Sequence, residues 1–319
     1  MKRVYVTRAL PGNALERLAA FDVSVHKEDR APAREEILAG LAGGVDGLLC
    51  LLTDAVDAGL MDAAGSRLKV ISNYAVGFNN IDVAEATRRG IIVTNTPGAL
   101  SEATADLAWA LLFAAARRVA EGDRFTRAGR FTGWGPSLLL GADIRRKTLG
   151  LIGLGRIGQA MVKPALGFEM RVVYHDIVRG EEAVEAELGV SYLPLPDLLD
   201  QADFISLHVP LLPETRHLID ASALRAMKPT AVLVNTSRGP IIDEAALVRA
   251  LNEGWIAGAG LDVYEAEPAL AHGLVECERA VLAPHIASAT WETRTKMAEM
   301  AVEAVLDVLA GRNPRHRVN

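Results

Sequence analysis

Short runs of β-branched and other apolar residues alternate with amphipathic segments along almost the whole chain. In the first third, the apolar runs that predict strands are residues 3–8, 23–26, 47–52, 69–74 and 91–95. The segments between these runs predict helices over residues 14–20, 34–41, 56–64 and 83–89. Strands that alternate with helices in this way are typical of a parallel, doubly wound sheet.

A second series of the same kind follows a break in the pattern. A turn signal at residues 96–98 precedes a long apolar helix, predicted over residues 102–119, and a glycine-rich stretch from 129 to 136. The strands predicted after it are residues 149–153, 171–176, 203–208, 231–236, 257–263 and 281–285. A final helix over residues 292–309 has no following strand and can return to the first series. The expected fold class is α/β, with two doubly wound parallel-sheet domains.

Composition narrows the class of protein and its compartment. A chain of 319 residues is comfortable for two domains that each bury a core. Half of the residues are hydrophobic but only 5% are aromatic, so the core must consist mainly of aliphatic side chains. The net charge of −6 argues against nucleic acid or an anionic membrane as the main partner. Cys50 and Cys277 lack metal-ligand spacing and are interpreted as reduced thiols of a cytoplasmic protein.

Three glycines with a defined spacing, Gly153, Gly155 and Gly158, follow a predicted strand and open a helix. Glycines at this spacing also occur in ordinary tight turns, so the motif alone is not decisive. In this context it predicts a Rossmann turn, in which the first glycine turns the chain, the second lets the backbone approach a pyrophosphate, and the third lets helix pack on strand. Pro164 falls within that helix and predicts a kink or an early stop.

The next predicted strand ends at an acidic residue, Asp176. Its carboxylate can accept hydrogen bonds from the ribose hydroxyls of a dinucleotide and would repel a 2′-phosphate. NAD(H) is therefore the preferred cofactor. Arg179 lies close by in the sequence and weakens that preference, which leaves NADP(H) open.

Three polar residues, Arg238, Glu267 and His285, each follow a strand-like run downstream of the glycine turn. Reduction of a 2-oxo acid needs a cation that orients the carboxylate, as arginine does, and a proton donor at the carbonyl oxygen. Histidine can be that donor, and a neighbouring carboxylate favours its charged form. Each residue taken alone has a more common interpretation than catalysis. Arg238 can form a surface ion pair, Glu267 can be a solvated loop acid, and His285 can be a core histidine whose hydrogen bonds are satisfied. Together, at the ends of consecutive strands, they predict hydride transfer on a small 2-oxo or 2-hydroxy acid.

Several ordered segments carry a recognisable pattern that covers nearly the whole chain. They are residues 73–82 (NYAVGFNNID), 207–211 (LHVPL), 234–239 (VNTSRG), 260–268 (GLDVYEAEP) and 283–288 (APHIAS). These segments resemble the signature motifs of the D-isomer-specific 2-hydroxyacid dehydrogenase family. Residues 104–109 (TADLAW) and 134–136 (WGP) are most similar to the glyoxylate and hydroxypyruvate reductases within it.

The resemblance implies a domain division and a set of site residues. A flavodoxin-like substrate domain would comprise residues 1–98, completed by residues 289–319, and an NAD-binding Rossmann domain residues 99–288, with the active site between them. Arg238 would anchor the substrate carboxylate and carbonyl, and His285 would be the general acid or base. Its partner would be Glu267, immediately before the proline, rather than Glu265. The implied cofactor contacts are Thr104, Gly153, Gly155, Arg156, Ile157, Gly158, Asp176, His208, Pro210, Thr215, Thr236, Ser237 and Asp262.

The substrate side is implied by fewer residues, namely Leu52, Val76, Gly77 and Trp134. Leu51 and Leu52 lie where phosphoglycerate dehydrogenases of this family carry an arginine for the phosphate. Apolar residues there imply a small substrate such as glyoxylate or hydroxypyruvate, reduced to a (2R)-hydroxy acid. The segment at Val76 and Gly77 resembles a carboxylate-binding loop, and an ordinary turn is the competing interpretation. The resemblance also implies a homodimer, with the apolar helix predicted over residues 102–119 packed in its interface. Trp134 would reach the partner's site or pack at the interface.

Two other functions are compatible with the same scaffold. Some proteins of this superfamily are nicotinamide-sensing binding modules, such as transcriptional corepressors, and they can keep all three polar residues. Others oxidise formate or phosphite, which changes the substrate but keeps the chemistry.

Overall fold

The computed structural model describes all 319 residues. The chain divides into two compact units, one of Met1–Leu100 with Ser288–Asn319 and one of Ser101–Ala287. The first unit contains a five-stranded sheet and the second a seven-stranded sheet, and all neighbouring strands in both run parallel. The predicted fold class, two parallel-sheet α/β domains, is confirmed.

The sheet of the first unit has the strand order β2-β1-β3-β4-β5, which is the flavodoxin-like order. Its strands are β1 (Arg3–Val6), β2 (Asp22–Val25), β3 (Gly47–Cys50), β4 (Val70–Asn73) and β5 (Ile92–Thr94). Its helices are η1 (Ala14–Leu18), α1 (Arg34–Leu41), α2 (Ala58–Ala64), α3 (Val83–Arg88) and α11 (Trp291–Leu309). The helix predicted over residues 14–20, between β1 and β2, is thus only the short 3₁₀ helix η1.

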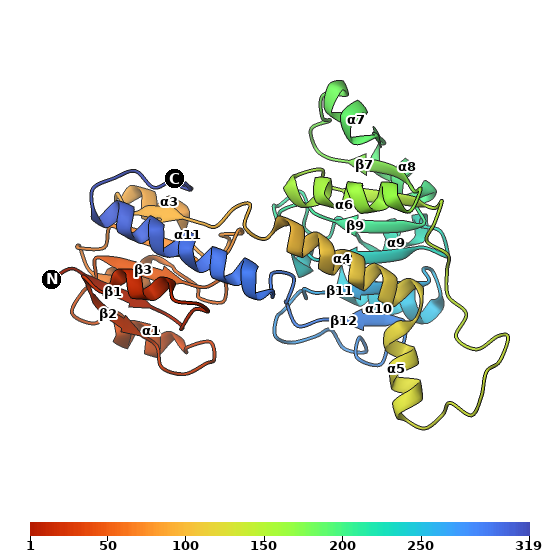
Figure 1. Cartoon of the computed structure of the whole chain (residues 1–319), viewed down its shortest axis with the longest axis horizontal. Coiled ribbons are helices and arrows are strands. Elements are labelled where there is room, and N and C mark those ends of the chain that lie inside the picture. The colour runs from red at the N-terminus through yellow and green to blue at the C-terminus, as the bar shows by residue number, and fades with distance from the viewer. The chain divides into compact units, whose positions relative to one another are not determined.

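The C-terminal helix α11 packs on the sheet of the first unit (Figure 1). Its buried face includes Ala301, Val302 and Val305, in the same apolar cluster as residues of β1, β3 and β4. Two side chains of the β4 segment add polar contacts, since the Ser72 hydroxyl donates to the carbonyl of Ala301 at 2.9 Å and the Tyr74 hydroxyl to that of Arg294 at 2.8 Å. The last segment of the chain therefore belongs to the core of the first unit.

The sheet of the second unit has the order β12-β11-β10-β9-β6-β7-β8. Its strands are β6 (Thr148–Ile152), β7 (Arg171–His175), β8 (Val190–Tyr192), β9 (Phe204–Leu207), β10 (Val232–Asn235), β11 (Gly258–Leu261) and β12 (Ala280–Leu282). Its helices are α4 (Ser101–Ala116), α5 (Val119–Arg127), α6 (Arg156–Gly167), α7 (Glu182–Leu188), α8 (Leu195–Gln201), α9 (Ala221–Ala226), η2 (Gly239–Ile241) and α10 (Glu244–Glu253). The strand order reverses between β6 and β9, which is where open α/β sheets bind ligands.

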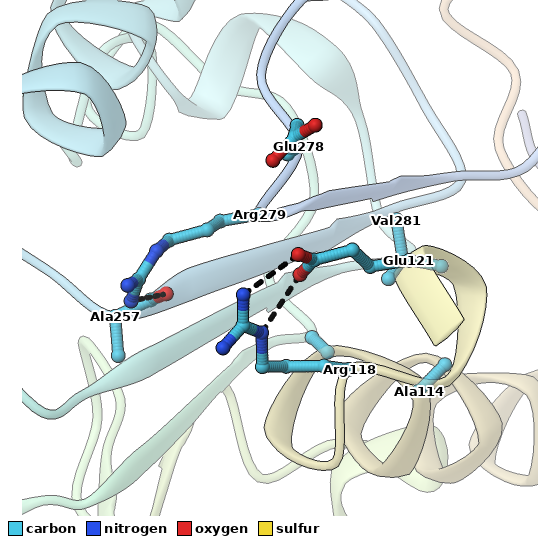
Figure 2. Close-up of a pocket in the computed structure, with 8 residues that line it drawn as sticks. Ala114, Arg118, Glu121, Ala257, Glu278, Arg279 and Val281 are labelled. Carbon is cyan, nitrogen blue, oxygen red and sulfur yellow. Dashed lines mark hydrogen bonds and ion pairs between the residues drawn. The ribbon is translucent and has the colours of Figure 1, made fainter. Parts of the chain in front are cut away.

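The long helix predicted over residues 102–119 is wrong at its C-terminal end. Helix α4 stops at Ala116, and Arg118 adopts a left-handed φ of 54° before α5 starts. The guanidinium of Arg118 donates from Nε and Nη2 to the two carboxylate oxygens of Glu121, both at 2.7 Å. Figure 2 shows this ion pair lining a small pocket with Ala257 and Arg279, which directly precede β11 and β12. The pocket therefore lies at the amino ends of these strands, opposite the edge that ends in the predicted catalytic residues.

Helix α4 uses its apolar residues inside its own unit. Trp109, Leu111 and Leu112 are buried, and the helix packs against α6, β10 and β11. The ring of Phe113 lies 5.6 Å from that of Trp109 and 5.3 Å from that of Phe168, measured between centroids. Apolar residues around more than one face of this helix thus reflect burial between sheet and helix rather than an exposed surface.

Two further features of the sequence behave differently from expectation. Helix α6 continues past Pro164 to Gly167, so the predicted early stop is wrong. The proline removes one intrahelical hydrogen bond, and the helix tolerates this loss close to its C-terminal end. Strand β8 was not predicted, because its three residues are too few to show a periodic pattern. No helix of the structure combines the length and the apolar character that a membrane crossing requires.

Candidate active site

The predicted functional residues of the second unit follow the carboxyl ends of its parallel strands. The glycine turn follows β6, Arg238 follows β10, Glu267 follows β11 and His285 follows β12. Since β6, β9, β10, β11 and β12 are consecutive neighbours in one parallel sheet, all of these segments leave the sheet at the same edge.

The three glycines of the turn after β6 have different surroundings. A Cβ atom at Gly153, where φ is +97°, would lie 2.8 Å from the carbonyl carbon of His208, and one at Gly158 would lie 2.2 Å from the carbonyl oxygen of Gly153. A Cβ atom at Gly155 would meet no other atom within 4 Å. The first and third glycines are therefore required by the packing of the protein itself, whereas the second one borders open space at the start of α6.

Buried polar atoms without partners lie on the neighbouring segments. Neither ring nitrogen of His208 has a hydrogen-bond partner, nor does the hydroxyl of Thr236. Burial lowers the pKa of His208 to about 3, so its imidazole is neutral. Most buried polar atoms of proteins are paired. Together with the open space at Gly155, these atoms fit the binding of a dinucleotide along this edge.

Asp176 is anchored to the glycine turn. Its Oδ2 accepts the N–H of Leu154 at 2.9 Å, and its Oδ1 accepts the N–H of Ile177 at 2.8 Å. Each carboxylate oxygen can still accept a further hydrogen bond, because it has more than one acceptor site. The acid is therefore held in a fixed place beside the turn, where it can also accept from a ribose.

Arg179, which follows Asp176 closely, is engaged by another acid. Its Nε and Nη2 donate to Oε1 and Oε2 of Glu185 at 2.8 and 2.7 Å, and the Tyr174 hydroxyl donates to Glu185 Oε1 at 2.7 Å. Hydrogen bonds from Arg179 and Tyr174 lower the pKa of Glu185 to about 2. The guanidinium therefore has an anionic partner within the protein and faces it in a bidentate geometry.

Glu267 and His285 are in direct contact. Nδ1 of His285 lies 2.8 Å from Oε2 of Glu267, and Oε1 of Glu267 accepts the N–H of Tyr264 at 2.9 Å. Burial alone would raise the pKa of Glu267, but the hydrogen bonds from His285 and Tyr264, with the charges of His285 and Arg238, hold it below its ordinary value. Because an anionic carboxylate only accepts, Nδ1 carries a proton and Nε2 is left for other partners.

Arg238 lies close enough to Glu267 for their charges to interact. Burial lowers the pKa of Arg238, and the charge of Glu267 opposes that effect. Its Nη1 donates to the carbonyl of Ser237 at 2.6 Å, and its own carbonyl accepts from the amide of Asn235 at 2.9 Å. An arginine remains protonated in such surroundings, so the segment after β10 presents a half-buried cation beside the histidine and glutamate pair.

The backbone at His285 is held by Asp262. His285 has a left-handed φ of 54°, and its N–H donates to the carbonyl of Asp262 at 2.9 Å. The carboxylate of Asp262 accepts the N–H groups of Ile286 and Ala287 at 2.7 and 2.8 Å. A non-glycine residue in this conformation persists only where its surroundings fix it, and such residues cluster at functional sites. In the structure, the predicted cofactor residue Asp262 therefore fixes the segment of the catalytic histidine candidate.

The remaining predicted cofactor residues differ in their surroundings. Thr104 is buried in the first turn of α4, and the hydroxyl of Ser237 donates to the carbonyl of Leu207 at 2.8 Å. Thr215 closes the loop after β9, because its hydroxyl donates to the carbonyl of Pro210 at 2.7 Å and accepts the N–H of Leu212 at 2.8 Å. Arg156 and Pro210 are exposed and Ile157 is half-buried.

In the first unit, two asparagines tie together the loops that carry the predicted substrate residues. The amide of Asn80 donates to the carbonyls of Leu51 and Asp54 at 3.0 and 3.1 Å, and the amide of Asn73 donates to the carbonyl of Gly77 at 2.8 Å. Leu52 is exposed at the tip of the first of these loops. The segments of Leu52, Val76 and Gly77 are thus ordered by the same network.

Two elements of the site were not found from the sequence. The N–H of Tyr264 helps to fix Glu267, and Gly239 allows the segment after Arg238 to lie against the peptide between Tyr264 and Glu265, where a Cβ atom would come within 1.8 Å of the Tyr264 carbonyl carbon. The glycine after Arg238 was a signal in the sequence that could have indicated a close backbone approach.

Comparison with known proteins identifies the family. Residues 109–287 match the family described as D-isomer specific 2-hydroxyacid dehydrogenase, NAD binding domain. The chain belongs to this family. It is 51% identical over 320 residues to the glyoxylate reductase of Korarchaeum cryptofilum, which covers 99% of this chain and 96% of the relative. It is 49% identical over 322 residues to the glyoxylate reductase of Thermococcus kodakarensis, with the same coverage of 99% and 96%.

Solved structures agree with this assignment. The glyoxylate reductase from Paecilomyes thermophila has a TM-score of 0.88 at 33% identity, over 99% of this chain and 98% of that one. An NADPH-dependent glyoxylate/hydroxypyruvate reductase from Sinorhizobium meliloti, in complex with citrate, has a TM-score of 0.85 at 32% identity, over 100% and 98%. The predicted family is confirmed. The protein is an oxidoreductase that uses a nicotinamide cofactor.

Replacing Gly158 by Ala should weaken NADH binding. The added methyl group would lie 2.2 Å from the carbonyl oxygen of Gly153, so the turn has to shift from the conformation that can accept a pyrophosphate. We expect NADH to bind about 10-fold more weakly. Titration of NADH fluorescence measures the change. Gly167→Ala is the control, because a methyl group at this other glycine of α6 meets no atom within 4 Å. Equal NADH affinity in both variants would contradict the role assigned to the turn.

Proposed function

We propose that this protein reduces glyoxylate and hydroxypyruvate, giving glycolate and the (2R)-hydroxy acid D-glycerate. The contact of His285 with Glu267 at 2.8 Å, beside the half-buried Arg238, is the observation that carries the proposal. It supplies a proton donor, an acid that stabilises its charge, and a cation for the substrate carboxylate. The relatives named glyoxylate reductases match over 99% of the chain and support the same substrates.

Arg238 orients the substrate in this mechanism. Its planar guanidinium pairs with the carboxylate of the 2-oxo acid and polarises the adjacent carbonyl group. Partial burial strengthens this interaction, because less water competes for the cation. Val76, Gly77 and Leu52 of the first unit are proposed to contact the rest of the substrate, and an apolar Leu52 suits a substrate without a phosphate.

His285 moves the proton. With Nδ1 donating to Glu267, the protonated ring has Nε2–H available for the carbonyl oxygen, which becomes the hydroxyl of the product. Glu267 stays anionic and stabilises the charged ring before the transfer. The nicotinamide cofactor, when bound, supplies the two electrons of the reduction. Full-length relatives named reductases favour this enzymatic role over a binding module, and over formate or phosphite oxidation.

A spectrophotometric screen tests the proposal. NADH and NADPH are each combined with glyoxylate, hydroxypyruvate, pyruvate and 3-phosphohydroxypyruvate, and loss of absorbance of the reduced cofactor is followed. We expect turnover with the first two substrates and little with the phosphorylated one. If none of the four compounds is reduced, the proposed function is refuted.

The pH dependence should identify the proton donor. Reduction needs the protonated imidazole, so its rate should fall as pH rises and the ring loses that proton. Oxidation of the hydroxy acid needs the neutral ring and should show the opposite trend. In Glu267→Gln, the pH at which reduction falls should be lower, because an opposite charge that favours the protonated ring is lost.

The same measurement on His285→Ala gives the size of its contribution. Turnover should drop about 10²-fold or more, as is usual when a positioned acid or base is removed. Glu276→Gln is a suitable control, since this acid between β11 and β12 is exposed. Near-normal turnover of His285→Ala, or an unchanged profile in Glu267→Gln, would exclude the assignment.

NAD(H) is the proposed cofactor, in preference to NADP(H). Asp176 would repel a 2′-phosphate, and the ion pair with Glu185 keeps Arg179 from neutralising it. In Glu185→Gln the ratio of kcat/KM for NADH to that for NADPH should fall by up to about 5-fold, because the released guanidinium can then pair with the 2′-phosphate. Glu187→Gln, an exposed acid of the same helix α7, should keep the ratio. A wild-type preference for NADPH would overturn the assignment.

A homodimer is also proposed. The segment from α5 to β6 exposes several large apolar side chains, namely Val119 (57%), Phe131 (55%), Trp134 (85%) and Leu140 (66%). Patches of this kind are usually covered by a partner, and a second copy would cover them here, with Trp134 reaching the substrate site of that copy. Light scattering at micromolar concentration should give twice the mass of the chain, and Trp134→Glu should reduce it. A monomeric wild type would rule the dimer out.

A further inference from the structure

Glu244 is a buried acid at the start of helix α10, with 3% of its surface exposed. Its Oε1 accepts the N–H of Glu265 at 2.7 Å, and its Oε2 accepts the N–H of Ala271 at 3.2 Å. Burial raises the pKa of Glu244, and the charges of Glu265 and Glu267 act in the same direction, although the two backbone hydrogen bonds oppose it. A carboxylate is costly to bury, so both of its oxygens have to be satisfied by the loop.

Both of these N–H groups belong to the loop that carries Glu267. The hydrogen bonds to Glu244 lie on either side of Glu267, and the N–H of Tyr264, next to that of Glu265, is taken by Glu267 itself at 2.9 Å. Two successive amides are therefore each held by a different carboxylate. The peptide between Tyr264 and Glu265 also lies against Gly239, where a Cβ atom would come within 1.8 Å.

Capping of its own helix does not explain Glu244. The carboxylate of the preceding residue, Asp243, is the cap of α10, since it accepts the N–H of Ala246 at 2.9 Å. The N–H groups that donate to the Glu244 carboxylate lie outside α10, in the segment that follows β11. Its contacts therefore link the beginning of α10 to the loop of Glu267, more than 20 residues later in the sequence.

We propose that Glu244 is a positioning residue for catalysis. It clamps residues 265–271 against Gly239 and so keeps Glu267 in hydrogen-bonding distance of His285 and beside Arg238. This role rests on the proposed function, because Glu267 matters only if His285 transfers the proton. Without the clamp the loop moves, the contact between Glu267 and His285 loosens, and the protonated imidazole loses part of its stabilisation.

Several charged groups face this pair, and the titratable Tyr264 lies among the acids Asp262, Glu244 and Glu267. His285 faces Glu267 and the carboxylate of Asp262, and Glu267 also faces Arg238. Glu244 faces Glu265 and Glu267, and Glu265 in turn contacts His217 at 2.6 Å and Arg216 at 3.4 Å. A change in the pH profile after substitution of Glu244 must therefore be compared with that of a control on the same helix.

The test compares Glu244→Gln with Asp243→Ala in the full-length enzyme. Glutamine keeps one acceptor for the N–H of Glu265 but turns a donor toward Ala271. We expect kcat of Glu244→Gln to fall about 10-fold, since small misplacements of catalytic groups are costly, while KM for NADH stays within about 2-fold. The pH at which reduction falls should also move down. Asp243→Ala should lose thermal stability through its missing cap and keep the wild-type profile.

Two outcomes overturn the proposal in an active enzyme: a wild-type pH profile in Glu244→Gln, or the same shift in Asp243→Ala. Titration of the His285 ring by NMR, assigned with His285→Gln, provides a readout that does not need activity. A lower midpoint in Glu244→Gln supports the clamp, and an unchanged one excludes it, even if the wild type reduces none of the substrates and the proposed function fails. If Glu244→Gln does not fold, the same NMR titration is carried out on Glu244→Asp, which keeps the charge on a shorter side chain.

Discussion

The close approach of two backbone segments at Gly239 sets the geometry of the site. The segment after β10 carries Arg238, and the segment after β11 carries Glu267; they meet where Gly239 lies against the peptide between Tyr264 and Glu265. Any side chain at position 239 would force them apart, because a Cβ atom would overlap the backbone. The parallel pairing of β10 with β11 brings these loops to the same edge, and the glycine then fixes their separation.

Buried carboxylates hold the loops of this site in place. Asp262 accepts two backbone N–H groups from the segment after β12, and Glu244 accepts two from the segment after β11. Burial raises the pKa of both acids. Such acids are expensive unless each oxygen has a donor, so each of them favours the one loop conformation that supplies the donors. The loops after β11 and β12 are therefore held by hydrogen bonds to their backbone in addition to the pairing of the strands.

The sequence predicted the two sheets and the glycine turn well, because repeated alternation and a glycine spacing are local signals. It did not predict β8, which has only three residues, nor the break at Arg118 and the helix α5 that follows it. In the site, the chemical roles of Arg238, Glu267 and His285 could be predicted from their residue types. Gly239 was a signal for a close backbone approach but did not identify the segment that approaches it. The role of Asp262 as an anchor could not be predicted, because it depends on a backbone segment distant in sequence.

Two acids separated by one residue illustrate why geometry has to decide between candidates. Glu265 and Glu267 both contact a histidine, since Glu265 lies 2.6 Å from Nε2 of His217 and Glu267 lies 2.8 Å from Nδ1 of His285. Only Glu267 adds the N–H of Tyr264 and the charge of Arg238. In an extended segment, residues at this spacing would share a side, and their separation onto different histidines requires the loop to turn between them. The contacts of both acids thus hold the turn between them, so the position of Glu267 depends on the contacts of Glu265 as well as on its own hydrogen bonds.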